Sequence, residues 1–224
     1  MTSLPAPAAR RVLKKLERVL TRVDGDAIDR DDKVPPRLLA ELERAGLFRL
    51  RVPRAHGGLG LSAADYHRAV AAVAERSLGL SMWVTTHQSL AGVALVSRAG
   101  TAEQRAALLP RLARGELSAL AVSEEDAGAD LRGLKTAARR VRGGWRISGR
   151  KVWIANAPVA RWVAVLAQAP AGPTVFLVDA RERGVRVERR CRFLGLRGME
   201  NGVLRLRGAF VPDSRRLGAE GDGL

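Results

Sequence analysis

Residues 120–130 of this 224-residue chain read Leu-Ala-Val-Ser-Glu-Glu-Asp-Ala-Gly-Ala-Asp, and residues 153–156 read Trp-Ile-Ala-Asn. The first stretch joins a short apolar run to a loop of small and acidic residues. It lies where the sequence pattern changes from helices to strands, and so marks a structural boundary. Because the chain is longer than a usual single domain, we expect one large or two modest domains.

The residues before this boundary have the periodicity of α-helices. In residues 12–23 the apolar side chains recur on one helical face. Residues 79–99 are mostly apolar and hold no proline, which predicts one long buried helix. Helix-opening and N-cap residues predict three further helices, which begin near Pro36, Ser62 and Thr101.

The residues after Ser118 have the pattern of short β-strands. Residues 136–148 predict a hairpin, because Gly143 and Gly144 separate two alternating runs. Further apolar runs predict strands at 152–154, 162–166, 175–178, 185–187 and 203–206. Strands without intervening helices favour an antiparallel barrel or sandwich. We therefore predict an α+β chain with an N-terminal α-helical domain at 1–117 and a β-domain at 118–212.

The formal net charge of +16 is large, and 34 of the 39 basic residues are Arg. Residues 132–151 contain eight basic residues and no acid. Such density would attract a polyanion. The sequence does not favour nucleic acid, since aromatic residues are 4% and no DNA-binding motif is present. A phosphate-rich cofactor, an acidic partner or an arginine-rich proteome would explain the charge better.

Composition also bears on the compartment. The single cysteine, Cys191, cannot form an internal disulfide, which fits a reducing cytoplasm. Apolar stretches end well short of the roughly 20 residues that a membrane span requires. The sequence therefore predicts a cytoplasmic protein without a membrane span.

The carboxylates in and after residues 123–126 could in principle bind Ca²⁺ or Mg²⁺, or act as a glycosidase pair. Their spacing matches no EF-hand loop, and one flexible loop does not fix the separation that glycosidase chemistry requires. We favour a solvated loop of ion pairs. The three histidines, His56, His67 and His87, have no nucleophile motif beside them, so we interpret them as structural or surface residues.

Several segments together resemble the acyl-CoA dehydrogenase family. Residues 123–130 are similar to its T-E-P-x-A-G-S-D segment, and residues 153–156 to its W-I-T-N segment. The order and spacing of the two match the family. The resemblance extends over most of residues 37–224 through motifs at 52–60 (VPRAHGGLG), 100–104 (GTAEQ), 195–198 (GLRG) and 210–212 (FVP).

The resemblance implies an FAD-dependent oxidoreductase of fatty acid metabolism that acts on acyl-CoA or another acyl thioester. It implies flavin contacts from Leu120, Val122, Ser123, Gly128, Trp153, Ile154 and Ala155, and a substrate contact at Ala129. Ser123 would offer a hydroxyl to the isoalloxazine edge, and Trp153 would pack on its ring. Backbone N–H groups around Gly128 would suit the anionic pyrophosphate.

Three residues depart from the family pattern. Ala155 replaces a Thr whose hydroxyl reaches the flavin, and Ala129 replaces a Ser that helps to bind acyl-CoA. Each change deletes a hydrogen bond worth about 1 kcal/mol if made. Glu125 replaces a proline, which loosens the loop and adds charge. These changes predict altered flavin tuning and weaker thioester binding.

The family's third domain, a four-helix domain, usually supplies the catalytic base. We interpret residues 213–224 as the start of a connection to that domain, which is absent here, and assign no catalytic residue. The leading hypothesis is therefore a truncated or split enzyme that is inactive alone and completed by a separately encoded helical partner in a homo- or hetero-oligomer. The alternatives are an inactive scaffold protein that keeps the fold, and a related flavin oxidase or monooxygenase.

Overall fold

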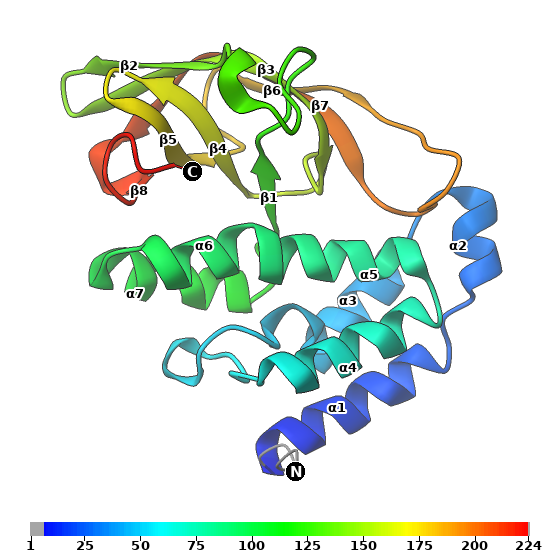
Figure 1. The fold of residues 1–224 in the computed structure, drawn as a ribbon. Helices are drawn as coiled ribbons and strands as arrows, with labels where there is room; N and C mark the ends of the chain where they lie inside the picture. The colour runs from blue at the N-terminus through cyan, green and yellow to red at the C-terminus, as the bar shows by residue number, and fades with distance from the viewer. Residues whose placement is uncertain (1–6, 224) are drawn as a thin grey trace.

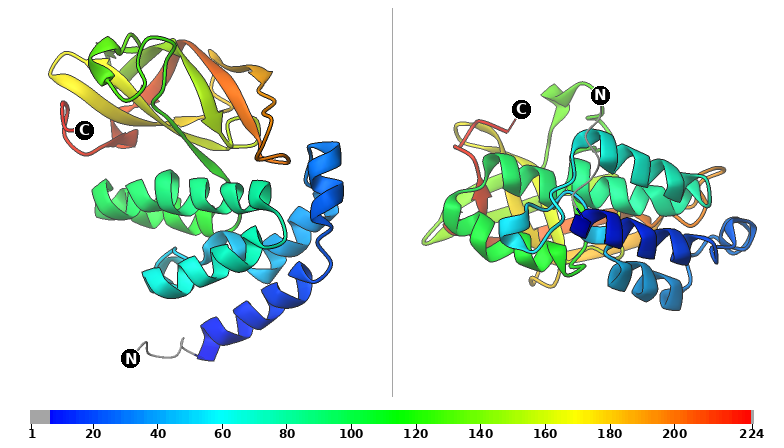
Figure 2. Two further views of the ribbon diagram at one scale, coloured as in Figure 1. Left: turned by 45° about the vertical axis from the view of Figure 1, so that its right-hand side comes forward. Right: turned by 90° about the horizontal axis from the view of Figure 1, so that it is seen from below.

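The computed structural model describes residues 7–223 and has two layers (Figure 1). A sheet formed by the second half of the chain lies over a layer of helices formed by the first half. The left view of Figure 2 shows the same two layers after rotation, with α1 farthest from the sheet. The predicted α+β class is confirmed.

Seven α-helices form the first layer of the described chain. They are α1 (Pro7–Leu20), α2 (Gly25–Asp31), α3 (Pro36–Ala45), α4 (Ala63–Ala74), α5 (Leu78–Thr85), α6 (Gly92–Ala99) and α7 (Ala102–Ala113). A π-helical turn, Thr86–Leu90, separates α5 from α6. The prediction of one helix over 79–99 was therefore wrong in part, since α6 starts afresh at Gly92. The short α2 was not predicted.

Local capping explains where these helices begin and end. Ser62 caps α4, and Thr101 forms a complete capping box with Gln104 at the start of α7. Gly46 ends α3 with φ of 98°, a left-handed conformation that glycine adopts at little cost. The sequence-based starts near Pro36, Ser62 and Thr101 are confirmed.

In the described part of the chain, eight strands form one sheet, which is the second layer. They are β1 (Ser118–Ala121), β2 (Ala137–Val141), β3 (Gly144–Ala155), β4 (Trp162–Ala169), β5 (Gly172–Asp179), β6 (Val185–Arg190), β7 (Asn201–Pro212) and β8 (Arg216–Leu217). The strand order is β6-β7-β3-β2-β4-β5-β8, with β1 paired to β4. The predicted hairpin is confirmed as β2 and β3. The run at 152–154 belongs to β3 and is not a separate strand.

Most strand pairs are antiparallel, as predicted, but β1 and β2 each run parallel to β4. The chain enters the sheet through β1 and leaves it for the loop at 122–136 before β2 begins. Apolar side chains of β4 and β5 pack with those of α6 and α7 between the layers. This packing fixes β1, and hence the start of the loop, against the helices.

Contacts also join the layers at the far edge of the sheet. Figure 1 shows α2 beside the loop between β6 and β7. Arg190 forms an ion pair with Asp32 at 2.6 Å, and Asp32 accepts a hydrogen bond from the Gly198 N–H at 2.9 Å. Within residues 7–223, no helix is long and apolar enough to cross a membrane.

Candidate functional site

The two segments singled out in the sequence lie against each other. Val152, just before Trp153, donates its N–H to the carbonyl of Ser123 at 2.9 Å. The ammonium of Lys151 donates to the carbonyl of Val122 at 2.8 Å and to Glu124 Oε1 at 2.7 Å. Residues 122–124 and 151–153 therefore form one hydrogen-bonded unit.

Glu124 organises the loop from within. Its carboxylate is 6% exposed and accepts the backbone N–H groups of Lys135 and Thr136 at 2.8 and 3.0 Å, besides the Lys151 ammonium. Burial acts to raise the pKa of Glu124, but the hydrogen bonds from Lys151 and Thr136 outweigh it, so that the pKa is lowered. Burial lowers the pKa of Lys151, an effect that Glu124 opposes. The buried carboxylate is thus ionised and fully bonded.

The remaining acids of the loop each face a cation. Asp130 forms an ion pair with Arg132 at 2.7 Å, Asp126 pairs with Lys135, and Glu125 pairs with Arg150. The interpretation of residues 123–130 as a loop of ion pairs is confirmed. Among the described residues, no three Asp, Glu, His or Cys side chains form a group that could hold a metal ion.

Trp153 points away from the core. Its side chain is 57% exposed, and its φ of 56° is left-handed, which is uncommon for a bulky residue. The side-chain amide of Asn201 donates a hydrogen bond of 3.0 Å to the backbone carbonyl of Trp153. Trp153 is therefore not an ordinary core residue; it offers an aromatic face to solvent beside Val152 and Ser123.

The other predicted contact residues differ in what they can offer. Val122 and Ser123 are half-buried, and Gly128 and Ala129 are exposed. A Cβ atom at Gly128 would meet no atom within 4 Å, so a ligand could approach the backbone there. Ala155 is half-buried at the end of β3.

Two predicted contact residues direct their side chains elsewhere. Ile154 is buried in the core of the sheet, and Leu120 packs against the apolar cluster between the layers. Each could reach a ligand through its backbone only. Over residues 7–223, neither the N–H nor the hydroxyl of Ser123 forms a hydrogen bond with another residue, and the side chain is only half-buried.

These features meet the requirements of a flavin. An isoalloxazine ring needs an apolar or aromatic surface and donors at its polar edge. Trp153 provides the aromatic surface, and the unengaged N–H and hydroxyl of Ser123 provide donors. The residues present therefore fit FAD.

Asn156 is a site residue that sequence reasoning missed. It is buried at φ of 63°, and its amide donates to the carbonyls of Trp83 and Ser118 at 3.1 and 3.2 Å. It thereby ties the end of β3 to α5 and to the start of β1. An Asn directly after Trp-Ile-Ala could have been recognised as a residue that tolerates a left-handed turn.

His87 lies under the same junction in the π-helical turn. Ser118 donates its N–H to Nδ1 at 3.1 Å, which places the ring proton on Nε2, facing the Leu112 carbonyl at 3.2 Å. Burial lowers the pKa of His87 to about 4, so the ring is neutral at pH 7. The interpretation of His87 as structural is confirmed.

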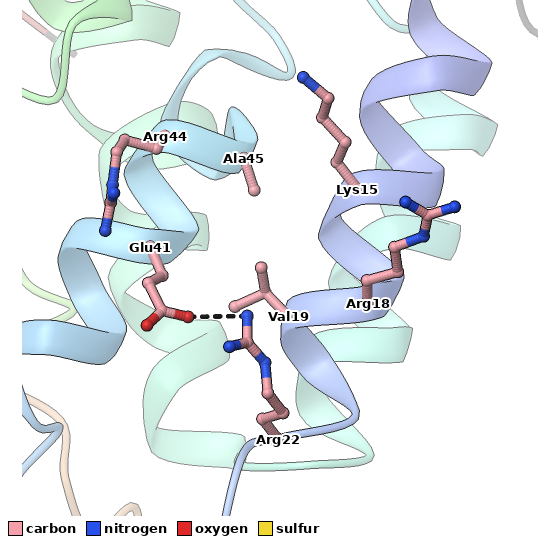
Figure 3. Close-up of a pocket in the computed structure, with 7 residues that line it drawn as sticks. All are labelled: Lys15, Arg18, Val19, Arg22, Glu41, Arg44 and Ala45. Atoms are coloured by element: carbon pink, nitrogen blue, oxygen red, sulfur yellow. Dashed lines mark ion pairs between the residues drawn. The ribbon is translucent and has the colours of Figure 1, made fainter.

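Other hollows lie elsewhere on the described surface. One of about 610 Å³ lies between α7 and residues 213–218, and one of about 600 Å³ between residues 51–61 and α6. A shallower groove of about 410 Å³ separates α1 from α3 (Figure 3). There Arg22 pairs with Glu41 at 2.8 Å, while Arg18 points away from α3. The basic side chains of this groove do not converge on one point.

The strand register places three arginines side by side on neighbouring strands of the sheet. Arg186 of β6 lies opposite Arg205 of β7, which lies opposite Arg150 of β3. Glu188 bonds both Arg150 and Arg205 at 2.8 Å, and these two guanidinium groups lower its pKa to about 2. The row is thus only partly neutralised.

Comparisons with known proteins agree with these features. The model of the acyl-CoA dehydrogenase N-terminal domain matches residues 9–116, and that of the middle domain matches residues 119–209. Probable acyl-CoA dehydrogenase FadE10 of Mycobacterium tuberculosis is 37% identical over 220 residues, which cover 95% of this chain and 34% of the relative. Benzylmalonyl-CoA dehydrogenase of Aromatoleum aromaticum is 36% identical over 88% of this chain and 53% of its own length.

Solved structures agree as well. Glutaryl-CoA dehydrogenase of Mycobacterium smegmatis, in complex with FADH2, has a TM-score of 0.85 at 27% identity and covers 97% of this chain. Butyryl-CoA dehydrogenase of Megasphaera elsdenii shares the fold with a TM-score of 0.89 at 23% identity over all of this chain. The chain spans 57% and 61% of these two proteins. It belongs to the acyl-CoA dehydrogenase family.

Proposed function

We propose that the chain forms the flavin-binding part of an FAD-dependent enzyme that oxidises acyl thioesters between Cα and Cβ. The observation that carries the proposal is the exposed ring of Trp153 beside the two unengaged donors of Ser123. Membership of the acyl-CoA dehydrogenase family supports it, as does the solved complex of glutaryl-CoA dehydrogenase with FADH2.

In this proposal each group of the site has a separate task. FAD, when bound, would supply the acceptor for a hydride from Cβ. Trp153 would pack on the ring and exclude water from one face. Ser123 would donate hydrogen bonds to the polar edge, and the open backbone at Gly128 would allow the pyrophosphate to approach. The acyl thioester would contact Ala129, whose side chain has no hydroxyl to donate a hydrogen bond.

The base that removes the α-proton comes from outside residues 7–223. A general base must be free to accept a proton. Every acid of the loop at 123–130 already bonds a cation. The relatives are longer than this chain, and we propose that a helical segment supplies the base, either in the same polypeptide or as a separate partner. The chain alone is then inactive.

The wider setting follows from the same proposal. We expect assembly into a homo- or hetero-oligomer, because a separate helical segment would have to cover the exposed Trp153. Cys191 is a buried free thiol, which is compatible with the cytoplasm. A place in fatty acid metabolism follows from the substrate class.

A second candidate is a scaffold protein that keeps the fold without catalysis. Ala155 and Ala129 favour it, because neither has the hydroxyl that the family uses. A third candidate is a flavin oxidase or monooxygenase, in which oxygen is the electron acceptor. The absence of a hydroxyl at Ala155, beside the flavin, is compatible with a changed reactivity toward oxygen.

Anaerobic addition of acyl-CoA to the FAD-loaded chain, alone and with a helical partner, distinguishes these functions. Bleaching of the flavin with the partner and not without it supports the proposal. Oxygen consumption when the acyl-CoA is added in air-saturated buffer instead would indicate an oxidase. If the chain binds no FAD and shows no thioester-dependent bleaching with the partner present, the proposal is wrong, and the scaffold function is the one supported.

A further inference from the structure

The ammonium of Lys151 is buried without contact to solvent. Its side chain is 0% exposed, and its two hydrogen bonds go to the Val122 carbonyl and to Glu124 Oε1. Burying an ion pair is costly, and an apolar pair of similar volume is often at least as stable. Fold stability alone therefore does not explain why a lysine lies here.

The hydrogen bond to Val122 has a geometric consequence. A trans peptide is planar, so the carbonyl of Val122 and the N–H of Ser123 point in opposite directions. Lys151 lies in the interior and holds the carbonyl inward. The N–H of Ser123 must then point outward, and it has no partner among residues 7–223.

Two more hydrogen bonds hold the next peptide, between Ser123 and Glu124. The carbonyl of Ser123 accepts the Val152 N–H at 2.9 Å, and Glu124 N–H donates to the Ala127 carbonyl at 2.8 Å. Glu124 in turn holds the ammonium from the other side at 2.7 Å. Lys151 thus bonds both the Val122 carbonyl and the carboxylate of Glu124.

We propose that Lys151 is a positioning residue for the flavin: it holds the Val122 carbonyl inward and thereby aims the Ser123 N–H at the polar edge of the ring. This inference rests on the proposed function, because it needs a flavin at Trp153 and Ser123. Lys151 itself touches neither the flavin nor the substrate.

The test separates positioning from simple stabilisation. Lys151→Met alone would leave Glu124 as an unpaired buried charge, so the informative variant is Lys151→Met with Glu124→Gln. This double variant removes both charges, and the single amide oxygen of Gln keeps an acceptor for one of the two N–H groups that bond Glu124, those of Lys135 and Thr136. Lys135→Met is the matched control: Lys135 also pairs with an acid of the loop, but at the surface, where its side chain is 74% exposed.

FAD binding, the reduction potential of bound FAD and the melting temperature are measured for all three proteins. We expect the double variant to bind FAD at least tenfold more weakly, or to show a lower potential, while it still unfolds in one cooperative transition. The control should match the parent in all three measurements.

The outcomes are distinct. A double variant that is folded and binds FAD with unchanged affinity and potential would overturn the positioning role. If it does not fold, the single variant Lys151→Gln decides, because its shorter side chain removes the hydrogen bond to the Val122 carbonyl: FAD affinity and potential equal to those of the parent would overturn the proposal. If the parent itself binds no FAD, the proposed function fails, and this inference with it.

Discussion

Replacing Asn156 by Ala should loosen the junction between the two layers. The buried amide donates to the carbonyls of Trp83 and Ser118, one in the helical layer and one at the start of β1. Losing both hydrogen bonds costs about 2 kcal/mol, at about 1 kcal/mol each. Ala at a φ of 63° adds about 1 kcal/mol, because its Cβ is strained there. The total is about 3 kcal/mol.

Urea unfolding and thermal melting measure this loss directly. For a chain of this size, about 3 kcal/mol corresponds to a melting temperature roughly 6–12 °C lower. Asn156→Gly is the matched control: it loses the same two hydrogen bonds but adopts the left-handed conformation freely. It should therefore be about 1 kcal/mol more stable than the Ala variant. A loss below about 1 kcal/mol in the Ala variant would refute the role given to these hydrogen bonds.

Three further predictions concern the junction and the loop. The pKa of His87 is lowered to about 4, so the folded chain binds a proton less readily than the unfolded chain. The free energy of unfolding should therefore fall by about 3 kcal/mol as the pH drops from about 6.5 to about 4. In urea titrations, His87→Gln should abolish this part of the pH dependence. Gly79→Ala should lower the melting temperature, since its Cβ would lie 1.9 Å from the Arg197 carbonyl; an unchanged value would show that the loop between β6 and β7 yields easily. Gly128→Ala should leave the melting temperature unchanged, because the Cβ meets open space, yet weaken FAD binding; equal affinity in a titration would exclude close approach of the cofactor there.

Helix boundaries and the β2–β3 hairpin could be predicted because local chemistry determines them. The Thr101 capping box, the left-handed Gly46 and the Gly143-Gly144 turn need no tertiary context. The break in the helix at 79–99 could not be predicted in this way. It depends on His87 and Ser118, which lie 31 residues apart and bond only in the folded chain.

The motifs predict flavin contacts within residues 120–130 and 153–156, and the structure brings these two segments together. The roles of Lys151 and Asn156 were overlooked because they arise from buried hydrogen bonds to distant backbone carbonyls. From the sequence alone, a lysine within a strand is interpreted as a surface residue; only the folded structure shows that Lys151 is fully buried.

FAD titration of the parent chain and of Trp153→Ala tests the central claim most directly. Trp153 is 57% exposed, so its removal should not change the melting temperature. Loss of ring stacking worth about 1.4 kcal/mol should weaken FAD binding about tenfold. The account predicts saturable one-to-one binding by the parent and this loss in the variant. Equal affinity of the two proteins, or no saturable binding by the parent, would contradict it.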